Sequence, residues 1–180
     1  MKDFKKITEE NFEDFLEGDH QEWLSERVYT FLMGNMCGSE CNLQESLIDC
    51  ESPIEQLLAL ELEDLRLDRI VNFNPYIDVL GIEKQEEIIA KGKKYRVDFL
   101  IPVYYKNQGG INFVIECDGH NFHQKTKKQV EADNKRQRDL QEEGCEIIRF
   151  SGTEIYHKPY QCAITVKNII LSKCKYINNE

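Results

Sequence analysis

Side chains that could hold a metal ion gather in one stretch of the chain, between residues 95 and 123. Apolar residues alternate on both sides of a short link at residues 106–110, which is typical of two half-buried β-strands joined as a hairpin. Each strand carries acidic residues near the end that faces away from the link. These residues are Asp98, Glu116 and Asp118.

The pairing register decides whether these carboxylates meet, because successive side chains of a strand point to opposite faces. A turn centred near Gln108 would place Asp98 opposite Asp118, with Glu116 diagonal to Asp98. Directly opposed Cβ atoms are about 5 Å apart and diagonal ones about 7 Å, separations that carboxylates can close around one cation. The expected site therefore requires Asp98 and Glu116 to share a face.

Carboxylates are hard oxygen donors, which suit Mg²⁺ or Mn²⁺ better than zinc. Such a cation polarises a phosphoryl oxygen and lowers the pKa of a bound water. His120 and His123 follow a glycine and could act as general acid or base. Zinc binding by these histidines with Cys117 is the alternative, although a clear fourth ligand is lacking.

Composition limits the class of protein. The chain has 180 residues, of which 41% are hydrophobic, enough for one substantial core. Seven cysteines without regular spacing indicate free thiols, and the first residues lack the apolar segment of a signal peptide, so we expect a cytoplasmic protein without membrane contact. A formal net charge of −10 argues against a surface uniformly coated for nucleic-acid binding.

A local basic stripe runs against this acidic background, from residue 125 to 138. Beside a metal site it could follow a phosphate backbone, although a solvated helix face is the ordinary interpretation. Arg149, in an apolar strand, could point toward the carboxylates or toward water. The candidate nucleic-acid contacts of the stripe are Lys125, Lys127, Lys128, Lys135 and Arg138.

Other segments predict the elements around the hairpin. Ser52 and Pro53 begin a helix that should extend to about residue 67, and Glu55 stands at the third position of a capping box. A short strand is expected around Gln85 and residues 88–89. The remaining expectations are a helix at 126–143 stopped by Gly144, a strand at 146–150, a helix at 159–173, and amphipathic helices between residues 8 and 33.

Several separate motifs resemble, in order, the very-short-patch-repair-like branch of the PD-(D/E)xK nuclease superfamily. The resemblance covers residues 51 to about 165. The motifs are Glu-Ser-Pro-Ile-Glu at 51–55, Gln85, Tyr-Arg-Val-Asp-Phe at 95–99, Ile-Glu-Cys-Asp-Gly-His-Asn-Phe-His at 115–123, Asp-Asn-Lys-Arg-Gln-Arg-Asp-Leu at 133–140 and Ile-Ile-Arg-Phe-Ser-Gly-Thr-Glu-Ile at 147–155.

The resemblance implies an α/β, restriction-endonuclease-like fold with a mixed central sheet flanked by helices, formed by residues 51–180. Residues 1–50 would be a helical N-terminal appendage. The implied activity is Mg²⁺-dependent or Mn²⁺-dependent hydrolysis of nucleic-acid phosphodiesters, with DNA as the expected substrate.

Position by position, the resemblance gives Asp98, Glu116 and the Cys117 carbonyl to the metal, and Glu55 as a carboxylate from the first core helix. Asp118 stands where the namesake pattern has a lysine. His120, His123 and Gln85 are the candidates for the lysine's role.

Two other functions stay open from sequence. One is a catalytically inactive nucleic-acid-binding module that retains the nuclease fold. The other is a metal-binding scaffold whose first fifty residues dock a protein partner.

Overall fold

The computed structural model describes residues 5–12, 14, 47–64, 77–79, 81–105, 109–119 and 126–177. Within these residues the fold is α/β, and helices flank a five-stranded mixed sheet. The strands are β1 (Ile77–Val79), β2 (Glu83–Ala90), β3 (Lys93–Tyr105), β4 (Gly109–Asp118) and β5 (Cys145–Ser151). The helices that cover the sheet are α4 (Pro53–Asp64), α6 (Lys127–Glu142), α7 (Gly152–His157) and α8 (Pro159–Ile177).

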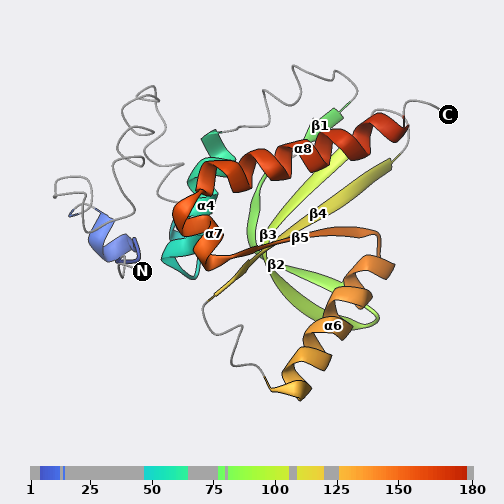
Figure 1. Cartoon of the computed structure of the whole chain (residues 1–180), viewed down its shortest axis with the longest axis horizontal. Helices are drawn as coiled ribbons and strands as arrows, with labels where there is room; N and C mark the ends of the chain where they lie inside the picture. Colours follow the sequence, from blue (N-terminus) through green and yellow to red (C-terminus); the bar gives the residue numbers. More distant parts are fainter. Residues whose placement is uncertain are drawn as a thin grey trace.

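The sheet is centred on β3 and β4. Its strand order is β1-β3-β4-β5, and β2 also pairs with β3. β3 and β4 are antiparallel, whereas β4 and β5 are parallel and are connected through α6. In Figure 1, α4, α7 and α8 lie on the upper side of the sheet and α6 lies on the lower side. The chain therefore has helices on both sides of a mixed sheet, as the sequence predicts.

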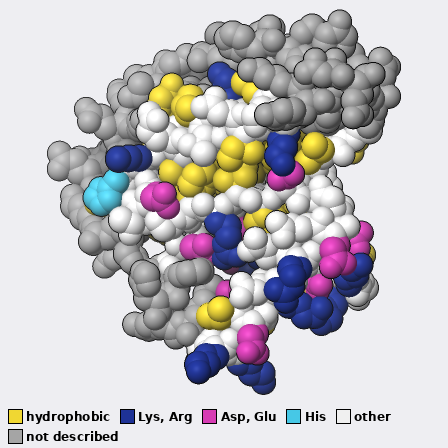
Figure 2. Space-filling model, turned by 45° about the vertical axis from the view of Figure 1, so that its right-hand side comes forward, with side chains coloured by type: hydrophobic (Ala, Val, Ile, Leu, Met, Phe, Trp, Pro, Cys, Tyr) yellow, Lys and Arg dark blue, Asp and Glu magenta, His cyan; other side chains and the backbone are white. Residues whose placement is uncertain are grey.

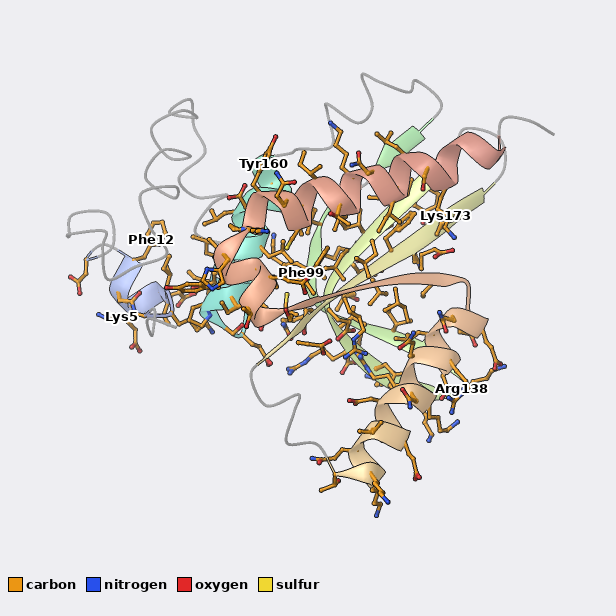
Figure 3. The ribbon with its side chains drawn as sticks, in the orientation of Figure 1. Lys5, Phe12, Phe99, Arg138, Tyr160 and Lys173 are labelled. Carbon is orange, nitrogen blue, oxygen red and sulfur yellow. The ribbon has the colours of Figure 1, made fainter. Side chains whose placement is uncertain are left out.

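Each side of the sheet has its own group of buried apolar residues. Phe99 and Ile115 pack in the larger core with Val166 of α8, and Figure 3 shows Phe99 between the sheet and these helices. Val114, between two residues of the larger core, packs instead with Leu140 of α6. This alternation along β4 is the period of two that the sequence displays.

Local sequence signals begin and end the helices. The Thr126 hydroxyl accepts a hydrogen bond from the Gln129 amide at 3.3 Å, and the Gln129 side chain accepts one from the Thr126 amide at 2.8 Å, so a capping box begins α6. Gly144, with φ of 84°, follows the end of the helix. The expected helix at 126–143 and its glycine stop are confirmed.

β3 changes its side-chain pattern at Asp98. Val97 and Leu100 belong to the α6 side, whereas Phe99 faces the larger core, so strict alternation fails between positions 97 and 99. Gln85 of β2 lies between the register pairs Lys84–Phe99 and Glu86–Val97, and it has φ of 53°. In Figure 1 the turn that joins β2 to β3 accordingly lies near α6, away from α8. Asp98 lies at this change of direction.

Described parts of the first fifty residues belong to the main core. Ile7, Phe12 and Leu47 are buried with the apolar residues of α4. Gln56 of α4 is fully buried and binds this segment through the Ile7 amide at 2.9 Å, the Ile7 carbonyl at 2.6 Å and the Leu47 carbonyl at 2.9 Å. Most of the predicted helical region at 8–33 lies outside the described residues, and its described start contains a 3₁₀ helix, Glu9–Asn11.

Other differences from the predictions are small. The short strand expected around Gln85 is the eight-residue β2, and the sequence did not predict β1 or α7. None of the helices in the described part of the chain is long and apolar enough to cross a membrane. Cys117, Cys145 and Cys162 carry free thiols.

Candidate functional site

The register of the β3–β4 hairpin differs from the expected one by two residues. Phe99 pairs with Ile115, so the next position, Asp98, comes opposite Glu116 and not opposite Asp118. A displacement of two residues leaves the side chains from Phe99 to Tyr105 on their expected faces. At Asp98, where the alternation of β3 breaks, the contact with β4 is made by the carboxylate itself, whose Oδ2 accepts a hydrogen bond from the amide of Cys117, the residue after Glu116.

Two glycines explain the displacement. The sequence predicts Gly109 and Gly110 in the link, but they are the first residues of β4 and pair with Tyr105 and Tyr104. A Cβ atom at Gly110 would lie 2.9 Å from the Val103 carbonyl oxygen, a distance that requires glycine. The link is shorter than predicted, and its centre moves toward β3.

Asp98 holds a proton more tightly than an ordinary aspartate. Its Oδ2 accepts a hydrogen bond of 2.6 Å from the Cys117 amide. Burial, followed by the negative charges of Glu116 and Glu55, raises the pKa of Asp98 from 3.8 to about 7, against the opposing effects of this hydrogen bond and of Arg136. Three carboxylates thus repel one another in a partly desolvated site, an environment that favours a bound cation.

Glu55 serves the helix start and the site together. Its carboxylate accepts hydrogen bonds from the Glu51 amide at 2.7 Å and the Ser52 hydroxyl at 2.6 Å, and the Ser52 hydroxyl accepts one from the Glu55 amide at 3.2 Å. The Gln85 side-chain amide also donates to Glu55, at 2.8 Å. The capping box is present, and it holds the buried carboxylate of Glu55 beside Gln85 of β2.

Glu116 has a cationic partner that sequence reasoning did not assign to the site. Arg136 of α6 donates from Nη2 to Glu116 Oε1 at 2.7 Å. Arg136 lies within the basic stripe of residues 125–138, but it is not among the predicted nucleic-acid contacts. Helical spacing offered the missing signal, since Asp133, Arg136 and Leu140 recur at i, i+3 and i+7, and Leu140 is fully buried.

Asp118 belongs to a second ion pair. Arg149 of β5 binds both of its carboxylate oxygens, from Nε at 2.9 Å and from Nη2 at 2.5 Å. Arg149 is the register partner of Glu116 in the parallel β4–β5 pair. The open question about Arg149 is thereby answered, because its side chain points toward the carboxylates.

The remaining predicted site residues lie outside the described part of the chain, or are half-buried, paired or exposed on α6. His120, His123 and Lys125 lie outside the described residues. Burial raises the pKa of the Cys117 thiol well above its usual value. Lys135 pairs with Asp139 at 3.2 Å. Lys127, Lys128 and Arg138 are exposed on α6.

Metal binding stays a prediction. Within the ranges that the structure describes, no group of three or more His, Cys, Asp or Glu side chains is arranged to hold a metal ion. Oxygens of Glu55, Asp98 and Glu116 accept hydrogen bonds from protein donors. The donor set itself, three carboxylates, has the chemistry that Mg²⁺ and Mn²⁺ prefer.

Comparisons with protein-family models, with curated proteins and with solved structures found no match to this chain. The functional argument therefore depends on the residues and their geometry.

Proposed function

We propose that this chain is a divalent-metal-dependent nuclease that hydrolyses phosphodiester bonds of nucleic acid, with DNA as the expected substrate. In this proposal it is a cytoplasmic member of the very-short-patch-repair-like branch of the PD-(D/E)xK superfamily, with a restriction-endonuclease-like fold. The observation that carries the proposal is the gathering of three carboxylates: Asp98 binds the amide of Cys117, the residue after Glu116, and the charges of Glu116 and Glu55 both raise the pKa of Asp98.

Four groups would hold the metal: the carboxylates of Asp98, Glu116 and Glu55, and the main-chain carbonyl of Cys117. A bound Mg²⁺ or Mn²⁺ would polarise a phosphoryl oxygen and make a water nucleophilic at neutral pH. The protein's contribution is orientation. The Cys117 amide fixes Asp98, and the Ser52 and Gln85 side chains fix Glu55.

The proton on Asp98 is part of the proposed chemistry. With a pKa of about 7, the Asp98 carboxyl is partly protonated at neutral pH, and metal binding would require its release. His120, His123 and Gln85 remain the candidates for the role of the missing lysine, which is to position or activate the water. Gln85 cannot act as a base, and its hydrogen bond to Glu55 supports a positioning role.

The surface near the site supports binding of a phosphate backbone. Figure 2 shows Lys and Arg side chains gathered on the lower part of the molecule, where α6 and the β2–β3 hairpin lie, with acidic side chains among them. Lys127, Lys128, Lys135 and Arg138 come from α6. Phosphate contacts of this kind give affinity without sequence preference.

A cleavage assay tests the proposal. Purified protein is incubated with labelled DNA or RNA and either Mg²⁺ or Mn²⁺, and Asp98→Ala and Glu116→Ala are compared with the wild type. We expect both variants to lose at least about a hundredfold in rate, because each removes a metal ligand.

Glu87→Gln is the matched control, since Glu87 is an exposed strand carboxylate that pairs with Lys94 at 2.7 Å. Cleavage that persists in both alanine variants would refute the assignment. Metal-dependent nucleic-acid binding without cleavage of any substrate would favour the inactive binding module.

A further inference from the structure

Arg136 connects the basic helix to the acidic site. Its guanidinium donates to Glu116 Oε1 at 2.7 Å and to the Arg96 carbonyl at 2.5 Å. The Arg136 side chain is 22% exposed, whereas that of Glu116 is 10% exposed. The arginine therefore reaches from a surface helix to a buried carboxylate while part of it still contacts solvent.

The charge of Arg136 acts on the whole cluster. It pairs with Glu116 directly, and it lowers the pKa of Asp98 against the larger effects of burial and the neighbouring carboxylates. A guanidinium and a divalent cation at Glu116 would repel each other and would share the same carboxylate. Binding of the metal would weaken the ion pair between Glu116 and Arg136.

A displaced Arg136 would have a suitable new partner in the substrate. A guanidinium presents a planar fork of donors that matches a phosphate as well as a carboxylate. The exposed lysines of the same helix would lie along the same backbone. From these contacts we infer that Arg136 has two positions, bound to Glu116 without metal and bound to a backbone phosphate of the nucleic acid once the metal is held.

This inference rests on the proposed function, and it makes a prediction about metal affinity that does not depend on catalysis. Arg136→Gln removes the competing charge, so Mn²⁺ should bind on the order of tenfold more tightly than in the wild type. The measurement is calorimetric titration with Mn²⁺. If Arg136 merely supported the site, the substitution would instead weaken or leave unchanged the metal affinity.

The second readout is nucleic-acid binding, measured by fluorescence anisotropy with a labelled phosphorothioate oligonucleotide that resists cleavage. The wild type should bind more tightly with Mn²⁺ than without it. Arg136→Gln should lose most of that metal-dependent gain and keep the metal-free affinity. Arg136→Lys keeps the charge, and we expect metal affinity close to that of the wild type.

Arg138→Gln is the matched control on the same helix. Arg138 is exposed, and Figure 3 shows it on the outer side of α6. Its loss should reduce oligonucleotide affinity by the same factor with and without Mn²⁺ and should leave Mn²⁺ affinity unchanged.

The outcomes separate the two proposals. A wild type that binds no Mn²⁺ would overturn the proposed metal-dependent function. A wild type that binds Mn²⁺, together with a folded Arg136→Gln that binds it no more tightly, would overturn the role of Arg136 alone. If Arg136→Gln fails to fold, Arg136→Lys provides the test. The increase in oligonucleotide affinity that Mn²⁺ produces should persist in this variant, and its loss would overturn the role of Arg136.

Discussion

Asp98→Asn should stabilise the protein at neutral and alkaline pH. The carboxyl of Asp98 has a pKa of about 7 in the folded chain against an ordinary value of 3.8, mainly because of burial and then because of Glu116 and Glu55. The folded state therefore binds this proton more tightly than the unfolded state does. Asparagine is neutral at every pH, and its side-chain oxygen can still accept the hydrogen bond from the Cys117 amide.

The size and sign of the effect follow from proton linkage. As pH rises from about 4 to about 7, the unfolded chain releases the proton first, so the free energy of unfolding of the wild type falls. One pKa unit corresponds to about 1.4 kcal/mol, so a pKa raised from 3.8 to about 7 predicts that Asp98 costs on the order of 4 kcal/mol at about pH 8. About 2–3 kcal/mol of that cost develops between about pH 5 and about pH 8.

The assay is urea unfolding of wild type and Asp98→Asn at these two pH values, with a chelator present to exclude metal. The difference in unfolding free energy should favour Asp98→Asn at both values and should be larger at the higher one. Equal pH dependence in the two proteins, or a less stable Asp98→Asn at about pH 8, would show that the carboxyl is not held protonated by its surroundings.

Asp139→Asn provides a control, because this substitution should lower the free energy of unfolding at about pH 8 where Asp98→Asn should raise it. Asp139 accepts a hydrogen bond of 2.6 Å from the Tyr95 hydroxyl, and this bond, followed by Lys135, lowers the pKa of Asp139 against the effect of burial. A lowered pKa stabilises the fold above the ordinary pKa of aspartate, and this contribution is lost as pH falls. Asp139→Asn should therefore be less stable than the wild type at about pH 8 and approach it in acid.

Two further substitutions test the fold around the site. Gln56→Leu should lower the free energy of unfolding by about 2–4 kcal/mol in urea, because it removes three hydrogen bonds and leaves buried groups of Ile7 and Leu47 without their partner. Gly110→Ala should lower it by about 1–3 kcal/mol, because the new methyl group would lie 2.9 Å from the Val103 carbonyl oxygen. An unchanged stability of Gly110→Ala would contradict the register that pairs this glycine inside the sheet.

Local signals in the sequence were sufficient for most elements. Ser52 and Pro53 began α4, Thr126 and Gly144 bounded α6, and alternation identified β3 and β4. Each of these features depends on neighbours within a few residues of the chain. The short elements β1 and α7 carry too few residues to show a period, and the sequence did not predict them.

The register and the arginine partners depend on contacts between distant segments. The two glycines after the link were assigned to a turn because glycine favours turns, yet Gly110 is required by the close approach of Val103. The basic stripe reads as one surface in the sequence, although the turn of a helix separates inward from outward positions. Arg136 and Arg138 differ by two residues and therefore lie on different faces of α6.

Arg149 and Arg136 differ in whether they could supply the positive charge that a lysine at position 118 would have supplied. Asp118 stands at the lysine's position, and Arg149 binds both of its carboxylate oxygens, so this pair adds no net charge there. Arg136 also pairs with a carboxylate, but that carboxylate is Glu116, which the proposed metal would claim. A divalent cation on Glu116 would release the charge of Arg136 and leave that of Arg149 neutralised. In the proposed nuclease, the positive charge available to the substrate would then come from α6 and not from the strand that carries the acids.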